Sequence, residues 1–104
     1  MKLIIISAVK ECKKDIGSIL SSVGVYTFSL FESRGYQIEP KVNNLENWFA
    51  TGTGTTEDVS IQACIRADLA YCCLNAINAY NAQLENEFKI SAYVMNVEQK
   101  NVEL

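Results

Sequence analysis

The sequence predicts an α+β domain in which strands and helices follow one another in the order β-α-β-β-α-β. Two segments place apolar residues at helical spacing, and four others alternate with a period of two or are rich in β-branched residues. The 104 residues provide enough chain for one domain, spanning 1–104, with a single core. Apolar residues make up 49% of the chain and charged residues 20%, a composition typical of a globular protein.

The first half of the chain predicts a strand, a helix and a second strand. Residues 2–9 are rich in β-branched side chains and are apolar on both alternating faces, as expected for a central strand that is covered on both sides. Residues 11–24 predict an amphipathic helix that ends at Gly24, with an apolar stripe made of Ile16, Ile19, Leu20 and Val23. Period two returns over 25–32, which predicts the second strand, and Gly35 is expected to mark its end or a bulge.

The second half predicts a long loop and then a strand, a helix and a strand. Residues 37–57 show no periodicity, and irregular segments of this length in a small domain tend to be functional or mobile. Residues 59–66 alternate as a third strand, and 88–97 predict a fourth. Asp68 is the expected N-cap of the second helix, whose buried stripe would consist of Leu69, Cys72, Cys73, Ala76, Ile77 and Tyr80.

This order of elements is that of ferredoxin-like folds, in which both helices cover one face of a four-stranded antiparallel sheet. The other face would then be bare, although residues 2–9 are apolar on both sides and Tyr93 and Met95 oppose the apolar residues at 90, 92 and 94. An exposed apolar patch of this size marks an interaction surface, so we expect other copies of the chain to cover it. The alternative is a monomer in which the loop or the tail folds over the sheet.

Composition and charge argue against several classes of function. Nine basic and twelve acidic residues give a net charge of −3, which disfavours a general nucleic-acid binder. The strand at 59–66 also lacks the stacking aromatics of an RNA-recognition sheet. The chain contains no histidine, the commonest general base and metal ligand, and no residue spacing points to another acid–base pair. We therefore expect neither an enzyme nor a metal site.

The cysteines and the N-terminal segment predict a cytoplasmic protein. Cys12, Cys64, Cys72 and Cys73 do not form the C-x-x-C spacing of a zinc or thioredoxin site, so we expect reduced and mostly buried thiols. The apolar run near the N-terminus is short, and lysines follow it directly, so we expect a first strand and not a signal peptide.

The segment GVYTFSLFESRGYQ at 24–37 resembles the corresponding segment of the PII signalling proteins, on the residues Gly24, Glu32, Arg34, Gly35 and Tyr36. The opening MKLIIISAVKE and the later KISAYVMNVE are similar to the first and last strands of that family. The resemblance implies a homotrimer whose three sheets line a central core. It also implies effector sites for ATP or ADP in the clefts between subunits, and a long T-loop, here about 37–57, that docks onto a partner.

The chain departs from the PII pattern where that family holds the nucleotide phosphates. The turn NAQLENEF contains Glu85 and Glu87 in place of a glycine-rich, lysine-bearing turn. Glu98 and Glu103 stand where the family carries arginines after the last strand. Carboxylates beside a triphosphate would repel it, so we do not expect ATP to bind in the usual PII manner. A less charged adenine nucleotide, such as AMP or a cyclic nucleotide, is easier to accommodate.

Residues near the base of the long loop are the candidates for a ligand cleft: Ser29, Gly35, Tyr36, Gln37, Gln62 and Arg66. Gly35 allows a close approach of the backbone, Tyr36 or Gln37 could contact a base, and Arg66 could clamp an anion. The alternative for these residues is an ordinary strand end with a solvated arginine.

Within the loop, TGTGTT at 51–56 has the ingredients of an anion-binding nest but is better explained as a linker. Trp48 and Phe49 are expected either to anchor a partner or to pack against their own subunit.

Together these features predict a non-enzymatic, PII-like regulatory protein that senses a small molecule and contacts a partner such as a membrane transporter. The alternative is a trimeric metal-handling protein resembling the CutA family, against which the missing histidine counts. An ACT-like ligand-binding module is a third candidate.

Overall fold

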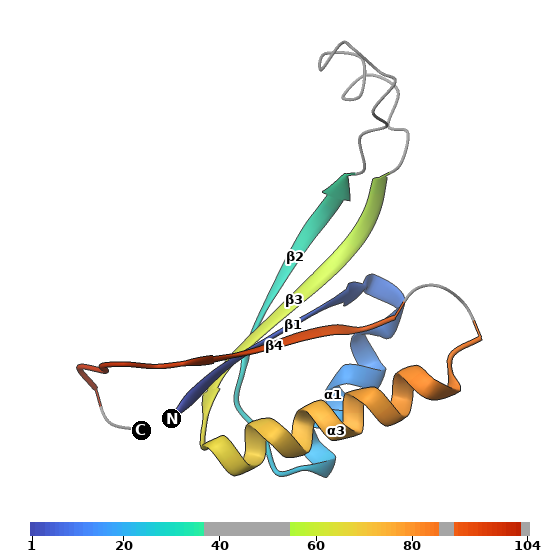
Figure 1. The fold of residues 1–104 in the computed structure, drawn as a ribbon. Helices are drawn as coiled ribbons and strands as arrows, with labels where there is room; N and C mark the ends of the chain where they lie inside the picture. The colour runs from blue at the N-terminus through green and yellow to red at the C-terminus, as the bar shows by residue number, and fades with distance from the viewer. Residues whose placement is uncertain (37–54, 86–88, 103–104) are drawn as a thin grey trace.

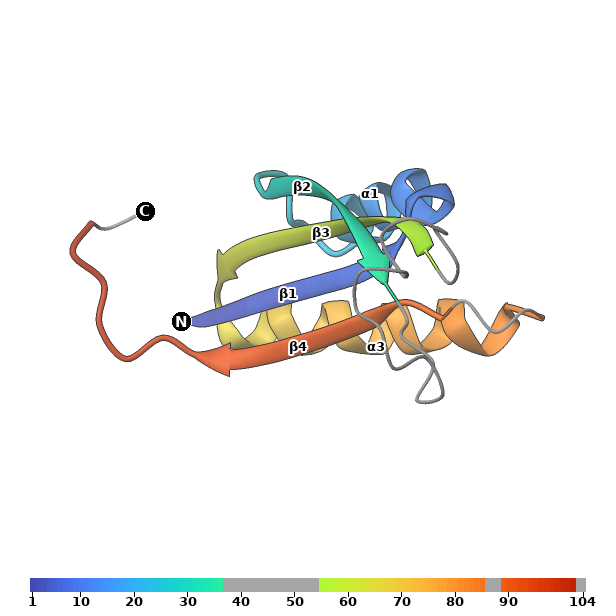
Figure 2. The ribbon, with the colours of Figure 1, turned by 90° about the horizontal axis from the view of Figure 1, so that it is seen from above.

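The computed structural model describes residues 1–36, 55–85 and 89–102. Its elements are β1 (Lys2–Val9), the 3-10 helix η1 (Lys10–Cys12), α1 (Lys13–Ser22), β2 (Ser29–Tyr36), β3 (Thr55–Ile65), α3 (Ala67–Gln83) and β4 (Ser91–Asn96) (Figure 1). The four strands form one sheet in the order β2-β3-β1-β4, and every neighbouring pair is antiparallel. Both helices lie on one side of this sheet (Figure 2). The predicted α+β, ferredoxin-like arrangement is therefore confirmed.

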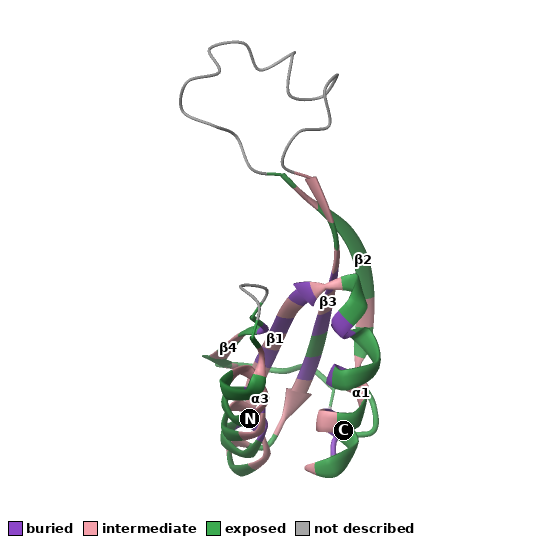
Figure 3. Ribbon diagram, turned by 90° about the vertical axis from the view of Figure 1, so that its right-hand side faces the viewer, coloured by how far each residue is buried: buried purple, intermediate pink, exposed green. Residues whose placement is uncertain are grey.

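The core lies between the sheet and the two helices. Along β1 and β3, buried residues alternate with less buried ones (Figure 3). The buried set of β1 comprises Ile4, Ile6 and Ala8, as the period of two predicts. The helices complete the core with Ile16 and Leu20 of α1 and with Ala70, Cys73 and Ile77 of α3.

The end of α1 follows the sequence prediction, but the start of β2 does not. Gly24 adopts a positive φ of 94°, the conformation that a helix-ending glycine provides, and the next amide, that of Val25, donates to Leu20 O at 2.8 Å. The prediction that the strand begins at residue 25 is wrong, since β2 begins at Ser29. Residues 25–28 carry the chain from the end of α1 to the edge of the sheet.

The second strand also continues past the point where the sequence suggested that it ends. Gly35 lies inside β2, opposite Thr56, and marks neither an end nor a bulge. Because β1 pairs with β3 only as far as Asp58, residues 34–36 and 55–57 continue as a two-stranded arm (Figure 1). The predicted loop at 37–57 therefore loses its last residues to β3, and 37–54 lie outside the described residues.

Two details of α3 differ from the sequence prediction. Asp68 is not the N-cap, because α3 begins at Ala67 and Arg66 occupies the cap position. Cys72 is exposed while Ala70 is buried, so the predicted buried stripe is wrong at Cys72. Ala70, Cys73 and Ile77 are spaced by three and four residues and face the sheet, which turns Cys72 toward solvent.

Candidate functional site

The sheet has an outer face, directed away from α1 and α3, that carries a band of apolar side chains. In the register of the strands, Ile5 lies opposite Tyr93, and Leu3 lies between Met95 and Cys64. Phe31 continues the outer face on β2, where it pairs with Ser60. Tyr93 is 59% exposed in the single chain and Phe31 50% exposed. The outer face is thus the apolar surface that the sequence predicted.

The predicted ligand residues fall into two groups that one chain does not bring together. Ser29 and Gln62 are direct partners in the β2–β3 register, whereas Gly35 and Tyr36 lie at the other end of β2, opposite Thr56 and Thr55. Gly35 lies six positions after Ser29 along the strand, which corresponds to about 20 Å. A single site that uses both groups would need two chains.

Three further predicted site residues, Gln37, Trp48 and Phe49, lie outside the described residues.

The guanidinium of Arg66 is engaged by a carboxylate of its own chain. Arg66 Nε lies 3.2 Å from Asp68 Oδ1, and Arg66 Nη2 donates to Asp68 Oδ2 at 3.3 Å. This is the two-pronged geometry with which arginine recognises carboxylates. An anion that binds Arg66 would have to share the guanidinium with Asp68 or displace it, and sequence reasoning had assigned Asp68 to a helix cap.

Gly35 makes a close backbone approach, but to side chains of β3. A Cβ atom at this position would clash with Asp58 Oδ2 and lie 2.7 Å from Thr56 Oγ1. The close packing of these two side chains therefore accounts for a glycine at position 35 within one chain.

A cavity of about 540 Å³, here called the basal cavity, opens between the arm, η1 and the end of α3. Its lining combines apolar, hydroxyl-bearing and acidic residues: Val9, Cys12 and Leu84; Thr55, Thr56 and Tyr80; Glu11 and Glu57. The volume is that of a typical small-molecule site. Sequence reasoning missed it because its walls come from three separate segments, 9–12, 55–57 and 80–84, and no motif links them.

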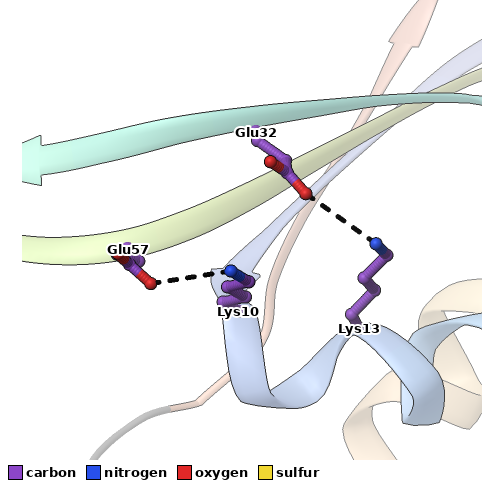
Figure 4. Close-up of polar contacts among 4 residues, drawn as sticks. All are labelled: Lys10, Lys13, Glu32 and Glu57. Carbon is purple, nitrogen blue, oxygen red and sulfur yellow. Dashed lines mark ion pairs between the residues drawn. The ribbon is translucent and has the colours of Figure 1, made fainter.

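Two ion pairs connect η1 and the start of α1 to the neighbouring strands β3 and β2 (Figure 4). Lys10 Nζ lies 3.7 Å from Glu57 Oε2, and Lys13 Nζ lies 3.8 Å from Glu32 Oε1. All four side chains are about half exposed or more, so each pair contributes at most about 1 kcal/mol to stability. A second, shallower hollow of about 340 Å³ lies beside them and includes Arg34 among its lining residues.

Tyr80 joins the two helices at the wall of the basal cavity. Its hydroxyl donates to Asp15 Oδ2 at 2.6 Å. This hydrogen bond, followed by burial, raises the pKa of Tyr80 above its ordinary value because the ionised phenol could no longer donate. The bond helps to hold α3 against α1.

Asp15→Asn should lower the pKa of Tyr80 toward the ordinary tyrosine value of about 10. Tyrosines of the unfolded chain ionise near that value while the folded wild type keeps Tyr80 protonated. The wild type should therefore lose stability as pH rises above about 10, and the variant should lose less. Titration of the tyrosine ring carbons by NMR measures the shift. Asp68→Asn is the matched control, and an unchanged Tyr80 titration in Asp15→Asn would contradict the assignment.

The cysteines are free thiols in four different environments. Cys12 and Cys73 are buried, Cys64 is half-buried on the outer face, and Cys72 is exposed. Burial, with a smaller effect of Cys72, raises the pKa of the Cys73 thiol, which keeps it protonated and unreactive. In the described ranges, no group of three or more cysteine, aspartate or glutamate residues is placed to hold a metal ion. None of the helices described is long and apolar enough to cross a membrane.

Comparison with known proteins adds evidence on the fold. No protein-family model matches the sequence, and no curated protein matches it. The chain is similar in structure to CPII, a nitrogen regulatory PII-like protein from Thiomonas intermedia K12, solved with ADP, AMP and bicarbonate bound. The TM-score is 0.65 at 13% sequence identity, over 92% of this chain and 88% of CPII. The likeness predicted from residues 24–37 is confirmed at the level of the fold: this chain has the fold of a nitrogen regulatory PII-like protein.

Proposed function

We propose that this chain is a non-enzymatic, PII-like regulatory protein that assembles as a homotrimer and binds a small effector between its subunits. The observation that carries the proposal is the apolar outer face, with Ile5, Tyr93 and Met95, in a chain that has a PII-like fold. Removing exposed apolar area of this kind from water is favourable, so an assembly that covers the outer face is stabilised. Sister subunits are the occupants that the fold suggests.

The effector site is proposed to combine residues of two neighbouring subunits. Ser29 and Gln62 of one chain would face Gly35, Tyr36 and Gln37 of the next, because about 20 Å separates the two groups within one chain. Arg66 would take part if an anion shared its guanidinium with Asp68 or displaced Asp68.

An adenine nucleotide with few phosphates is the proposed ligand. CPII was solved with ADP and AMP bound, which supports this class. The exposed Glu85 of this chain disfavours a triphosphate, as the sequence already suggested.

The segment around 37–54 is proposed to contact the partner, with Trp48 and Phe49 as apolar anchors. The proposed partner is a membrane transporter, which this segment would contact on the cytoplasmic side of the membrane. The reduced thiols fit such a location.

Light scattering and a thermal-shift panel test this proposal together. We expect the mass of a trimer at micromolar concentration, and AMP or ADP should raise the melting temperature more than ATP does. A ligand at 100 times its Kd stabilises the folded state by about 2.7 kcal/mol. Gln62→Ala should reduce the AMP shift, whereas Gln83→Ala, on the exposed end of α3, should leave it unchanged. A monomeric mass would contradict the proposal, and stabilisation by copper or zinc alone would favour a CutA-like metal-handling protein.

A further inference from the structure

Both charged residues among the described lining of the basal cavity are acidic. Glu11 and Glu57 contribute carboxylates to its wall, and no lysine or arginine is among its described lining residues. Two lysines beside this wall are already engaged. Lys10 pairs with Glu57 of the wall itself, and Lys89 donates to Asn81 O at 2.8 Å and to Leu84 O at 2.6 Å. A phosphate or carboxylate entering this cavity would therefore meet the carboxylate of Glu11 and a Glu57 that is shared with Lys10, with no lysine or arginine among the described lining residues to bind it.

The hydroxyl of Tyr80, an uncharged polar group of the wall, also favours a hydrogen-bond-donating cation as the ligand. The Tyr80 hydroxyl donates its only O–H to Asp15, so towards a ligand its oxygen can only accept a hydrogen bond. The cavity also lies at the C-terminal end of α3, where the last carbonyls carry partial negative charge. The ammonium of Lys89 already donates to Asn81 O and Leu84 O, so this helix end holds one cation of its own chain.

Val9, Leu84 and the buried Cys12 form an apolar part of the wall, beside the hydroxyl-bearing Thr55 and Thr56. A bare metal ion does not fit this lining, because the described residues place no group of three metal-binding side chains together. An apolar body that carries a hydrogen-bond-donating cation matches both parts of the wall.

We infer that the basal cavity binds a small organic amine, with its apolar body against Val9, Cys12 and Leu84 and its ammonium group directed toward Glu11 and Glu57. This site goes beyond the proposed regulatory function. It is built from one chain, whereas the proposed nucleotide site requires two.

Three probes with one ring system and different charges test the inference on the full chain by isothermal titration calorimetry. Tryptamine is cationic, tryptophol is neutral, and indole-3-acetate is anionic. We expect one tryptamine per chain, bound about tenfold more tightly than tryptophol, because charge-assisted hydrogen bonds are stronger than neutral ones. Indole-3-acetate should bind more weakly than tryptophol. Binding of the anion as tight as that of the amine, or no binding of any probe, would overturn the inference.

Isosteric variants locate the site. Glu11→Gln and Glu57→Gln should each weaken tryptamine binding roughly three- to tenfold and leave tryptophol binding unchanged. Glu98→Gln removes an exposed carboxylate outside the cavity and should have no effect. Equal losses in all three variants, or no loss in the first two, would show that the amine binds elsewhere.

Circular dichroism verifies that each variant is folded. The measurement is repeated on a monomeric form of the chain, such as one with a charged outer face. Amine binding that persists there supports the cavity even if the trimer proposal fails, and amine binding that disappears on dissociation overturns a site built from one chain.

Discussion

Replacing Ile6 with alanine should lower the free energy of unfolding by about 3 kcal/mol. Ile6 is completely buried between the sheet and the helices, where it pairs with Ile61 on β3 and Ala92 on β4. The loss combines the transfer energy of the removed atoms with the cost of the cavity that remains. Urea denaturation measures this loss of unfolding free energy. The protein concentration is kept fixed, because assembly of subunits would make the apparent stability depend on it.

The neighbouring residue on the same strand provides the control for Ile6→Ala. Ser7 points to the outer face, and Ser7→Ala should change stability by less than about 0.5 kcal/mol. A cost below about 1 kcal/mol for Ile6→Ala would contradict the assignment of this side of β1 to the core.

Ile5→Lys should dissociate the proposed trimer while each chain stays folded. Ile5 lies at the centre of the outer face, between Tyr93 and Gln62 in the sheet register. In a separated chain the new ammonium group can reach water, but in an assembly that covers this face it would be buried without a partner. Sedimentation should show the mass falling from that of a trimer to that of a monomer, with an unchanged far-UV circular dichroism spectrum.

Tyr26→Lys is the matched control for Ile5→Lys. Tyr26 is 78% exposed and lies in the connection before β2, away from the centre of the outer face. This variant should keep the mass of the wild type. An Ile5→Lys protein that remains assembled would show that subunits associate through another surface, and the proposed effector cleft would lose its basis.

The alternation of residues 2–9 illustrates how much of the fold the sequence could predict. Ile4, Ile6 and Ala8 point to the helices, and Leu3, Ile5 and Ser7 point away, as period two requires. The helix end at Gly24 was equally predictable, because the positive φ there is a local property of glycine. Such local rules specified the elements, their order and their buried faces.

Long-range pairing accounts for the errors at β2. The apolar residues at 25–28 look like part of a strand, but a strand forms only where a partner accepts its hydrogen bonds. That partner, β3, starts at Thr55 and therefore carries β2 past Gly35 to Tyr36. No property of residues 25–36 alone could reveal where β3 would pair.

The functional features also divide into those that local sequence predicts and those that only long-range contacts create. Amino-acid order alone determined the strand and helix pattern, the apolar outer face and the likeness to PII proteins, since these depend on periodicity and on short local segments. Only the tertiary structure decided that Ser29 and Gly35 stand far apart, that Asp68 holds Arg66, and that an acidic cavity forms beneath the arm. Those features arise from side chains that are distant in sequence and become neighbours only when the sheet pairs and α3 packs against it.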